Sequence, residues 1–436
     1  TNHPPGATTM TETAKKTRLH DWHVARGAHM AIFGNYAMPL WYSSGARQEH
    51  LAVLSRAGIF DTSHMGVVTV KGAGARDLLQ VCFSKNLAAC LGKNQTPLTS
   101  GKSVYGVFMN EAGEVIDDAI VFQIYDSLYM VVVNAGMGGA VAAHLQGYAG
   151  GRKAAVVDLT DQLGKLDVQG PLAARIVARV IKNPPEVFAQ LPYFSFKGHT
   201  NAVLPVSKKV TLTDGTPILL SRTGYTGEFG FELFVAPEKF IDLWQRLIAA
   251  GRPLGMLPCG LAARDSLRTG AVLPLAHQDI GPWPFKNNPW SFALPYDANG
   301  RGFTKDFVGA VALQRTDDGC HTVAFAGFDP RKVAATDAAV VVDDAGRDIG
   351  RILTCATDMA IGRHDGRIIS IASPDKPDGF TPRGLSCGFV KVTRPLAPGQ
   401  IVRLKDNRRT IEVEIVADIR PDRTARQPMA RFLNET

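Results

Sequence analysis

Three strand-like runs of apolar residues follow one another between residues 103 and 134, separated by short polar stretches. The runs are SVYGVFMN, VIDDAIVFQIY and LYMVVVNAG, and the stretches between them are EAGE and DS. Turns this short are typical of neighbouring antiparallel strands. The pattern therefore predicts an antiparallel meander, with a helix before it over about 73–83 and another after it over about 138–149.

Helical periodicity appears again in the middle of the chain. Phe240, Leu243, Trp244 and Leu247 recur at the spacing that places side chains on one face of a helix. Further helices are expected over GPLAARIVARVI, where Pro171 stands near the start, and over CGLAARDSLRTGA. The stretch ILLSRTGYTGEFGFELFVAP reads as two strands around a glycine-rich turn. These elements predict an α+β fold with antiparallel sheets and flanking helices.

The last part of the chain, about 318–436, alternates short apolar runs with turns. This pattern predicts a small β-barrel or β-sandwich. Before it, residues 273–309 are rich in proline, aromatic residues and asparagine, and they are expected to form an ordered connector. We therefore divide the chain into a disordered tail over residues 1–17, a core of two interleaved lobes over 18–317, and a C-terminal β-barrel domain over 318–436.

Composition and charge exclude several classes of protein. The 436 residues are 45% hydrophobic and 20% charged, and no run of apolar residues is long enough to predict a membrane-spanning helix. The first residues lack the apolar core of a secretory signal. The six cysteines form no CxxC pair, so we expect free thiols, no metal site and a cytoplasmic protein. The net charge of +8 suits an anionic ligand, although no nucleic-acid-binding motif is present.

Two adjacent carboxylates, Asp117 and Asp118, interrupt the middle run of the meander. Aspartate is depleted in strands, and a buried carboxylate without partners is costly. Successive strand residues point to opposite faces of a sheet, so these two side chains are not expected to form a dyad on one face. Either one of them faces a binding pocket, or both are solvated beside the hairpin.

Acidic residues also occur in the glycine-rich turn TGYTGEFGFE. Its glycines permit positive φ angles and a close approach of the backbone to a ligand, although no phosphate-binding motif is present. Glu228 and Glu232 are four residues apart and would lie on the same face of a strand. They either belong to a binding site or are the exposed acids of a hairpin.

Two further motifs allow both a functional and a structural interpretation. Arg264 and Arg268 share one face of a predicted helix and would together hold a carboxylate, unless that face is merely solvated. The stretch FDTSHM contains the residue types of a Ser-His-Asp triad, but it has no nucleophile elbow. A packed, hydrogen-bonded side chain is therefore the favoured interpretation of His64.

Taken in order, the motifs resemble those of one family, the glycine cleavage T-proteins, which are tetrahydrofolate-dependent aminomethyltransferases. The stretches that carry the resemblance are HVARGAHMAIFGNYAMPLWY, GIFDTSHMG, NEAGEVIDDAIV, VVVNAG, VQGP, TGYTGEFGFE and GLAARDSLR. The resemblance covers residues 18–436 and is strongest between residues 27 and 280. It implies a three-lobed ring around a central folate pocket, with a C-terminal β-barrel as the third lobe.

The resemblance also implies an activity and a set of site residues. Members of the family move the one-carbon unit of aminomethyl lipoate, carried by the lipoylated H-protein, to tetrahydrofolate and release ammonia. By position in the motifs, Asp118 would be the catalytic residue on the pterin side of folate, Glu232 would bind the amino-imino edge of the pterin, and Arg264 would line the same site. The other expected pocket residues are Met65, Val132, Asn134 and Tyr225.

The sequence departs from the family pattern after the arginine helix. An acidic segment usual in T-proteins is replaced by one containing Trp283, Phe285 and Trp290, and Tyr36 stands where T-proteins commonly have tryptophan. The aromatic segment either packs the third lobe against the ring or accepts another donor, as in a tetrahydrofolate-dependent demethylase of a small methylated amine, sulfonium or ether. A non-catalytic folate-binding protein is ranked last, because RTGYTGE lacks the cysteine of that branch's KGCYxGQ motif.

Overall fold

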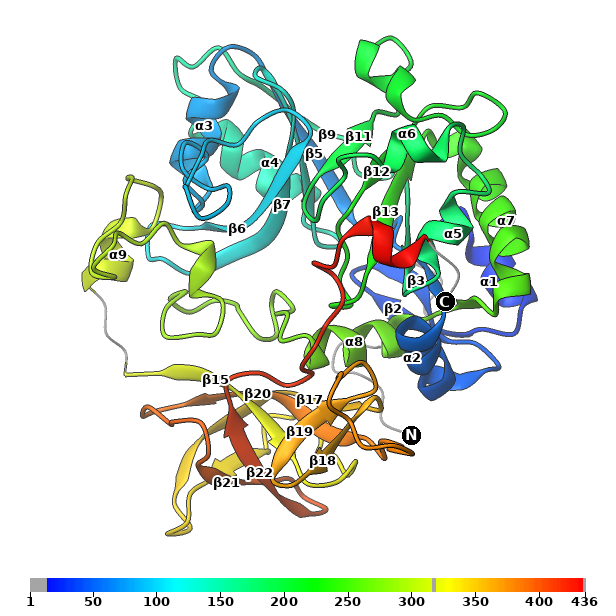
Figure 1. Cartoon of the computed structure of the whole chain (residues 1–436). Helices are drawn as coiled ribbons and strands as arrows, with labels where there is room; N and C mark the ends of the chain where they lie inside the picture. Colours follow the sequence, from blue (N-terminus) through cyan, green and yellow to red (C-terminus); the bar gives the residue numbers. More distant parts are fainter. Residues whose placement is uncertain (1–13, 316–318, 434–436) are drawn as a thin grey trace.

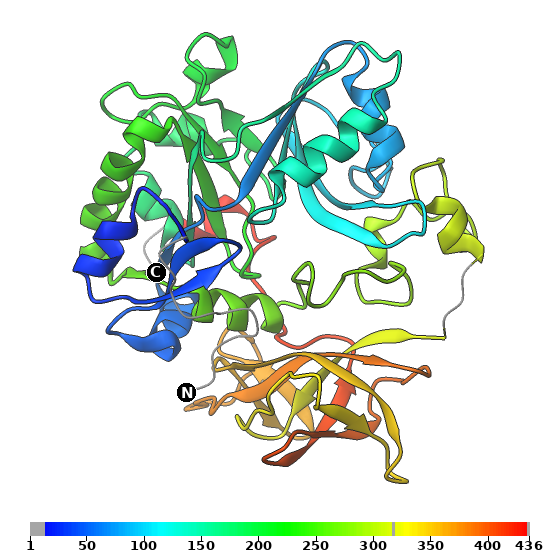
Figure 2. The same cartoon turned by 180° about the vertical axis from the view of Figure 1, so that it is seen from behind.

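The chain folds mainly into two open sheets and a closed barrel, as a computed structural model shows (Figure 1). The structure describes residues 14–315 and 319–433. The two open sheets stand side by side above the barrel, and helix α8 (Leu261–Gly270) runs between the barrel and the sheets (Figures 1 and 2). This arrangement of antiparallel sheets, flanking helices and a C-terminal barrel confirms the predicted fold class.

The first open sheet contains the predicted meander. Its strand order is β6-β7-β8-β5-β9, and all neighbouring strands are antiparallel. One face packs against helices α3 and α4, where Val121, Val131 and Leu145 belong to one buried cluster. The bounds are β5 Gly66–Lys71, α3 Ala75–Cys82, β6 Lys102–Met109, β7 Val115–Tyr125, β8 Leu128–Val133, α4 Gly138–Gly147 and β9 Ala155–Asp158.

The second open sheet has the strand order β11-β12-β13-β10-β4-β14. Helices α5 and α7 cover one face, and the predicted apolar stripe of α7, from Phe240 to Leu247, is fully buried there. The bounds are β4 Gly58–Asp61, β10 Gly164–Gln169, α5 Ala173–Val177, α6 Pro184–Phe188, β11 Phe196–Gly198, β12 Ile218–Ser221, β13 Gly230–Val235, α7 Phe240–Gly251 and β14 Leu257–Pro258.

The faces of the two open sheets that carry no helices pack against each other. Phe122 of β7 meets Phe234 of β13 edge-on, with ring centroids 5.9 Å apart, and Val132 of β8 lies in the same cluster. Alternate residues of β7 share this face, so Asp118 points the same way as Ile120 and Phe122. The fold therefore places Asp118 at the junction between the two sheets.

The N-terminal segment forms a small sheet with the order β1-β3-β2. Strand β1 pairs in parallel with β3, and the Thr17 hydroxyl donates to Asp61 Oδ2 over 2.8 Å. The predicted disordered tail, residues 1–17, is therefore wrong from β1 onward, because backbone pairing holds these residues; residues 1–13 lie outside the described residues. The bounds are β1 Lys15–Lys16, α1 His20–Ala25, β2 His29–Phe33, β3 Tyr36–Trp41 and α2 Gly45–Ser55.

The C-terminal strands close into a barrel with the order β15-β20-β17-β16-β21-β22, not a sandwich. After the barrel, the chain returns to the second sheet, where Phe432 packs on Phe229 with ring centroids 4.1 Å apart. The predicted barrel domain, 318–436, thus includes a stretch that leaves the barrel. The bounds are η4 Ser291–Ala293, α9 Ala310–Arg315, β15 His321–Gly327, β16 Val340–Val342, β17 Asp348–Asp358, β18 Ile361–His364, β19 Arg367–Ser370, β20 Leu385–Val392, β21 Ile401–Lys405, β22 Thr410–Val416 and η5 Met429–Phe432. None of the helices in the described residues is long and apolar enough to cross a membrane.

Candidate active site

A cavity of ≈ 530 Å³, called here the large cavity, opens where the two open sheets meet. Strands β6, β7 and β8 supply one wall, and the glycine-rich turn before β13 together with α8 supplies another. Every residue that the family resemblance assigns to the site lines this cavity. These residues are Met65, Asp118, Val132, Asn134, Tyr225, Glu232 and Arg264.

Asp118 is held by two hydrogen bonds at the wall of the large cavity. The Tyr105 hydroxyl donates to Oδ2 over 2.8 Å, and the Asn134 side-chain amide donates to Oδ1 over 2.6 Å. Burial raises the pKa of Asp118 above its ordinary value, against the lowering effect of these two hydrogen bonds. A carboxyl group with a raised pKa takes up a proton more readily than an ordinary aspartate, as an acid–base group must.

Asp117 is fully buried and contacts the same asparagine. The backbone N–H of Asn134 donates to Asp117 Oδ2, and its side-chain amide donates to Oδ1, each over 2.8 Å. The expectation that the two aspartates act on separate faces is therefore only half right. Of the two, only Asp118 lines the large cavity. Both carboxylates nevertheless bind Asn134, because Asn134 directly follows the end of β8, the strand next to β7, and its side chain reaches both of them. The alternative with both aspartates solvated is wrong.

The two aspartates are coupled electrostatically. Burial and then the nearby charge of Asp118 raise the pKa of Asp117 well above its ordinary value. Two carboxylates that share one amide donor are each made harder to ionise by the other. The pair therefore retains a proton at a higher pH than isolated aspartates would.

Glu232 begins a chain of buried charges behind the large cavity. Lys165 Nζ donates to Glu232 over 2.6 Å and to Asp167 Oδ1 over 2.9 Å, and Arg264 donates to Asp167 Oδ2 over 2.9 Å. The Thr223 hydroxyl donates to the second oxygen of Glu232. Asp167 and Glu232 are direct partners in the β10–β13 ladder, so neighbouring strands fix this arrangement.

The prediction of exposed acids in the glycine-rich turn is wrong, because both glutamates are buried. Glu228 is 5% exposed and is bound by Arg420, whose Nε lies 3.1 Å from it, and by Thr424. Both partners come from the segment after the barrel. Glu228 thus fastens that segment to the core, whereas Glu232 remains on the cavity wall.

The two arginines of α8 do not act together on one ligand. Arg264 lies over the Tyr225 ring, 4.8 Å from its centroid, and lines the large cavity. Arg268 is fully buried and is held by Asp265 over 2.7 Å and by Asp279. The paired carboxylate clamp is therefore wrong, because Asp265 and the buried Asp279 occupy the second guanidinium.

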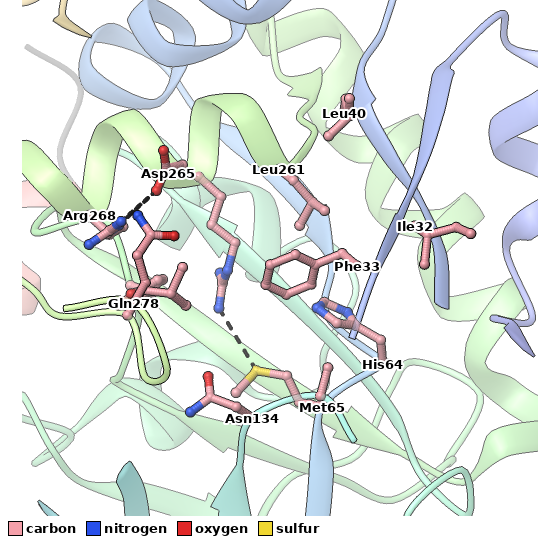
Figure 3. A pocket seen from close by; sticks show the side chains of 14 residues that line it. Ile32, Phe33, Leu40, His64, Met65, Asn134, Leu261, Asp265, Arg268 and Gln278 are labelled. Carbon is pink, nitrogen blue, oxygen red and sulfur yellow. Dashed lines mark hydrogen bonds and ion pairs between the residues drawn. The ribbon is translucent and has the colours of Figure 1, made fainter. Parts of the chain in front are cut away.

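A smaller, mostly apolar cavity of ≈ 70 Å³ adjoins the large one (Figure 3). The two cavities share part of their walls, so a ligand in one cavity would lie next to a ligand in the other. The shared residues are Met65, Asn134, Tyr225 and Arg264. The small cavity is otherwise lined mainly by apolar side chains, including Ile32, Phe33, Leu40, Leu261 and Leu275.

His64 lies in the wall of the small cavity and is packed as predicted, but its predicted hydrogen bonding is not observed at Nδ1. This atom is buried and has no hydrogen-bond partner among the described residues. A Ser-His-Asp triad is also ruled out, since Asp61 is bound by His23, whose Nε2 lies 2.9 Å from it, and by the Ser63 hydroxyl over 2.7 Å. His64 therefore remains uncommitted beside the site.

The burial of His64 predicts a pH dependence of stability. Burial lowers the pKa of His64 to about 4 from an ordinary value of 6.5. As pH falls from about 6.5 to about 4, the unfolded chain takes up a proton that the folded chain does not, so the folded state loses on the order of 3 kcal/mol. His64→Phe should remove this loss, measured as the melting temperature against pH. An equal fall in melting temperature at low pH in the variant would contradict the buried, neutral imidazole. His364→Phe, at a partly exposed site, serves as the control.

The aromatic segment that departs from the family pattern packs against the barrel. Trp290 is fully buried and meets Phe389 of β20 edge-on, with ring centroids 5.0 Å apart. Phe285 belongs to the same buried cluster. Trp283 lies beside cationic side chains of the barrel. The structure thus favours the packing interpretation of this segment. Phe292, just after it, lines the large cavity.

The sequence did not reveal Tyr105, which lines the large cavity, or Lys165 and Asp167, which hold Glu232 and Arg264 from behind. Tyr105 stands opposite Ile120 in the β6–β7 ladder and therefore lies on the cavity face, but this requires the register of the strands. For Lys165 and Asp167 a signal does exist. They alternate with apolar residues in GKLDVQG, and charges inside a strand flanked by other strands need buried partners.

Comparisons with known proteins show the family and agree with the fold. The family described as the GCVT N-terminal domain matches residues 19–284. An aminomethyltransferase of Streptomyces coelicolor is 39% identical over 305 residues, covering 69% of this chain and 73% of its own, and one of Symbiobacterium thermophilum is 35% identical over 323 residues, covering 73% and 80%. The crystal structure of the glycine cleavage system aminomethyltransferase T from Bartonella henselae superposes with a TM-score of 0.71 at 25% identity, covering 94% of this chain and 98% of its own.

Proposed function

The chain belongs to the GCVT family of aminomethyltransferases, and on this premise we propose that it transfers the aminomethyl group of a lipoylated carrier, the H-protein, to tetrahydrofolate. In the overall reaction the S–CH₂ and CH₂–NH₂ bonds of the donor break, two new N–CH₂ bonds to tetrahydrofolate form, and ammonia and a free thiol leave. The two hydrogens lost from the acceptor nitrogens complete the thiol and the ammonia. The convergence of Asp118, Glu232 and Arg264 on one cavity is the observation that carries this proposal.

The large cavity suits tetrahydrofolate, which supplies the two nitrogens that receive the carbon. Glu232 would accept the adjacent N–H groups of the pterin, because a carboxylate oxygen already bonded to Lys165 or Thr223 keeps a further lone pair. Tyr105 and Phe292, with ring centroids 5.8 Å apart, offer an aromatic wall. Cations in the same lining suit the anionic glutamate end: Lys85, Lys102 and Arg426.

The small cavity suits the donor. Its apolar lining fits the end of an aliphatic arm, and its shared wall with the large cavity would bring the two reactants together. Asp265 and Gln278 also line a further cavity of ≈ 430 Å³ between α2, α8 and the barrel. We infer that the arm of a carrier protein enters from the barrel side, where these two cavities share lining residues.

Asp118 would act as the proton-exchanging group. It lies on the cavity wall, its pKa is raised by burial, and Tyr105 and Asn134 fix its orientation. The acceptor nitrogens lose protons and the departing amine gains one, so a positioned carboxyl group can assist both changes. Asp117, held behind Asn134, would orient the amide that orients Asp118.

Glu232→Gln is expected to weaken tetrahydrofolate binding about tenfold, because the amide offers one acceptor oxygen where the carboxylate offers two. Isothermal titration with tetrahydrofolate measures this directly. Glu228→Gln is the matched control: it should lower the melting temperature, since Glu228 pairs with buried Arg420, and leave the affinity within twofold. Unchanged affinity in Glu232→Gln would remove Glu232 from the site.

A donor screen tests the proposed function. Tetrahydrofolate is incubated with the protein and either aminomethyl-loaded lipoyl H-protein or a methylated amine, sulfonium or ether. We expect methylenetetrahydrofolate and ammonia to form when the donor is the loaded H-protein, and no product with the other donors. Methyltetrahydrofolate formed from a methylated compound without H-protein would replace this proposal with a demethylase, and tetrahydrofolate binding without transfer from any donor would make the protein non-catalytic.

A further inference from the structure

The wall of the small cavity contains a polar side chain that is not committed within the protein. His64 is 3% exposed, and its Nδ1 is buried without a hydrogen-bond partner among the described residues. The neighbouring polar groups, by contrast, are engaged. Their bonds are Arg264 to Asp167, Asp265 to Arg268, Gln278 to Thr354, Asn134 to Asp117 and Asp118, and Tyr225 to the carbonyl of Pro274.

The imidazole of His64 is held in place by aromatic packing, although its Nδ1 has no hydrogen-bond partner among the described residues. The rings of Phe33 and Tyr36 pack against it edge-on, with centroids 5.8 and 6.2 Å away. Figure 3 shows His64 beside Phe33 and Met65, directed toward the interior of the cavity. Buried polar groups are nearly always hydrogen-bonded, and an unsatisfied one is costly. A polar ring fixed at an apolar cavity therefore calls for a partner that enters from outside.

We propose that His64 binds the amine nitrogen of the transferred aminomethyl group, and the ammonia that leaves, by accepting an N–H hydrogen bond. The inference rests on the proposed function, since it takes the donor to occupy the small cavity. The amine is the part of that donor with N–H groups, because the thioether sulfur and the methylene carbon have none. At ≈ 70 Å³, the cavity admits such a small group but not a second ring system.

The charge state of the ring agrees with an acceptor role. Burial lowers the pKa of His64 to about 4, and the charges of Arg264 and Lys165 act in the same direction while Asp61 opposes them. The ring is therefore neutral at physiological pH and carries one nitrogen lone pair. A charged imidazolium would have repelled an ammonium ion, whereas the neutral ring binds and orients it without taking its proton.

The reverse reaction isolates this contact, because ammonium is then a substrate. His64→Phe keeps an aromatic ring but removes the acceptor, so KM for ammonium should rise about tenfold, the effect of one lost hydrogen bond. KM for methylenetetrahydrofolate should stay within twofold. His64→Gln, which restores an acceptor oxygen, should recover part of the ammonium affinity.

Two measurements that do not depend on turnover complete the test. The melting temperature of His64→Phe should equal or exceed that of the native protein at pH 7.5, because an unpaired polar group is removed, and the Kd for tetrahydrofolate should be unchanged. An unchanged KM for ammonium would overturn the assignment, and so would a matching loss of folate affinity or thermal stability, which would make His64 structural. No reverse turnover by the native protein with any H-protein would refute the proposed function itself.

Discussion

Asp118→Asn is expected to lower kcat/KM for aminomethyl transfer by at least about 100-fold without lowering the free energy of unfolding. The amide can still accept from Asn134 and can donate to the Tyr105 oxygen, so the geometry of the site survives. What is lost is a carboxyl group able to take up and release a proton. Because both hydrogen bonds of residue 118 can be kept, the folded state should not lose stability.

Asp117→Asn is the matched control, and it should lower stability more and activity less than Asp118→Asn does. Both oxygens of Asp117 accept from Asn134, one from the backbone N–H and one from the side chain. An amide can satisfy only one of them, so we expect a loss of about 1–3 kcal/mol in urea unfolding and a smaller loss of activity, about tenfold. Equal losses of activity in the two variants would contradict the assignment of Asp118 as the proton-exchanging residue.

Arg420→Met is expected to lower the free energy of unfolding by about 3–5 kcal/mol. Arg420 is 1% exposed and pairs with two buried acids, Glu228 through its Nε over 3.1 Å and Asp358 of β17 through a second nitrogen. It also donates to the carbonyls of Thr226 and Leu267. One side chain therefore joins the segment after the barrel to the barrel, to α8 and to the glycine-rich turn.

Removal of the Arg420 side chain would leave two buried carboxylates, Glu228 and Asp358, without the guanidinium that pairs with both. Burial alone would raise the pKa of Asp358, but the charges of Arg420 and His50 outweigh it and lower that pKa. Arg423→Met is the control from the same segment: its pair with Asp418 is partly exposed, so the loss should be under about 1 kcal/mol. Equal losses in urea unfolding of the two variants would show that Arg420 does not fasten these parts together.

Much of the fold follows from local patterns in the sequence. Alternating runs and very short turns predicted the meander of β6, β7 and β8, and the period of the apolar residues predicted the buried face of α7. These elements are set by neighbours a few residues apart. The pairing of β4 between β10 and β14 depends on segments far apart in the chain, and no periodicity reports it.

The residues of the candidate site were assigned where they lie in recognisable motifs. Asp118, Glu232 and Arg264 were assigned by resemblance, and the structure brings them to one cavity. The side-chain contacts were not predictable in the same way. Alternation separated Asp117 from Asp118 and the resemblance selected Asp118, but neither could show that Asn134, which follows the next strand, binds both carboxylates.

Buried polar networks account for the other differences between the sequence-based interpretation and the structure. Arg268 and Glu228 were read as ligand-binding or exposed residues because their own segments are polar. Their partners, Asp279 and Arg420, come from stretches that carry no sign of pairing with them. Charge complementarity across a fold depends on which elements meet, and one sequence without its tertiary contacts does not specify that.

The central claim is transfer from a lipoyl-bound aminomethyl group to tetrahydrofolate at the cavity of Asp118. A single-turnover experiment with equal amounts of enzyme, tetrahydrofolate and aminomethyl-loaded H-protein, ¹³C-labelled in the aminomethyl carbon, measures it most directly. The predicted result is one labelled methylenetetrahydrofolate and one ammonia per aminomethyl group, with no product from Asp118→Asn on the same timescale. Label that remains on the H-protein in the presence of native enzyme and bound tetrahydrofolate would contradict the claim.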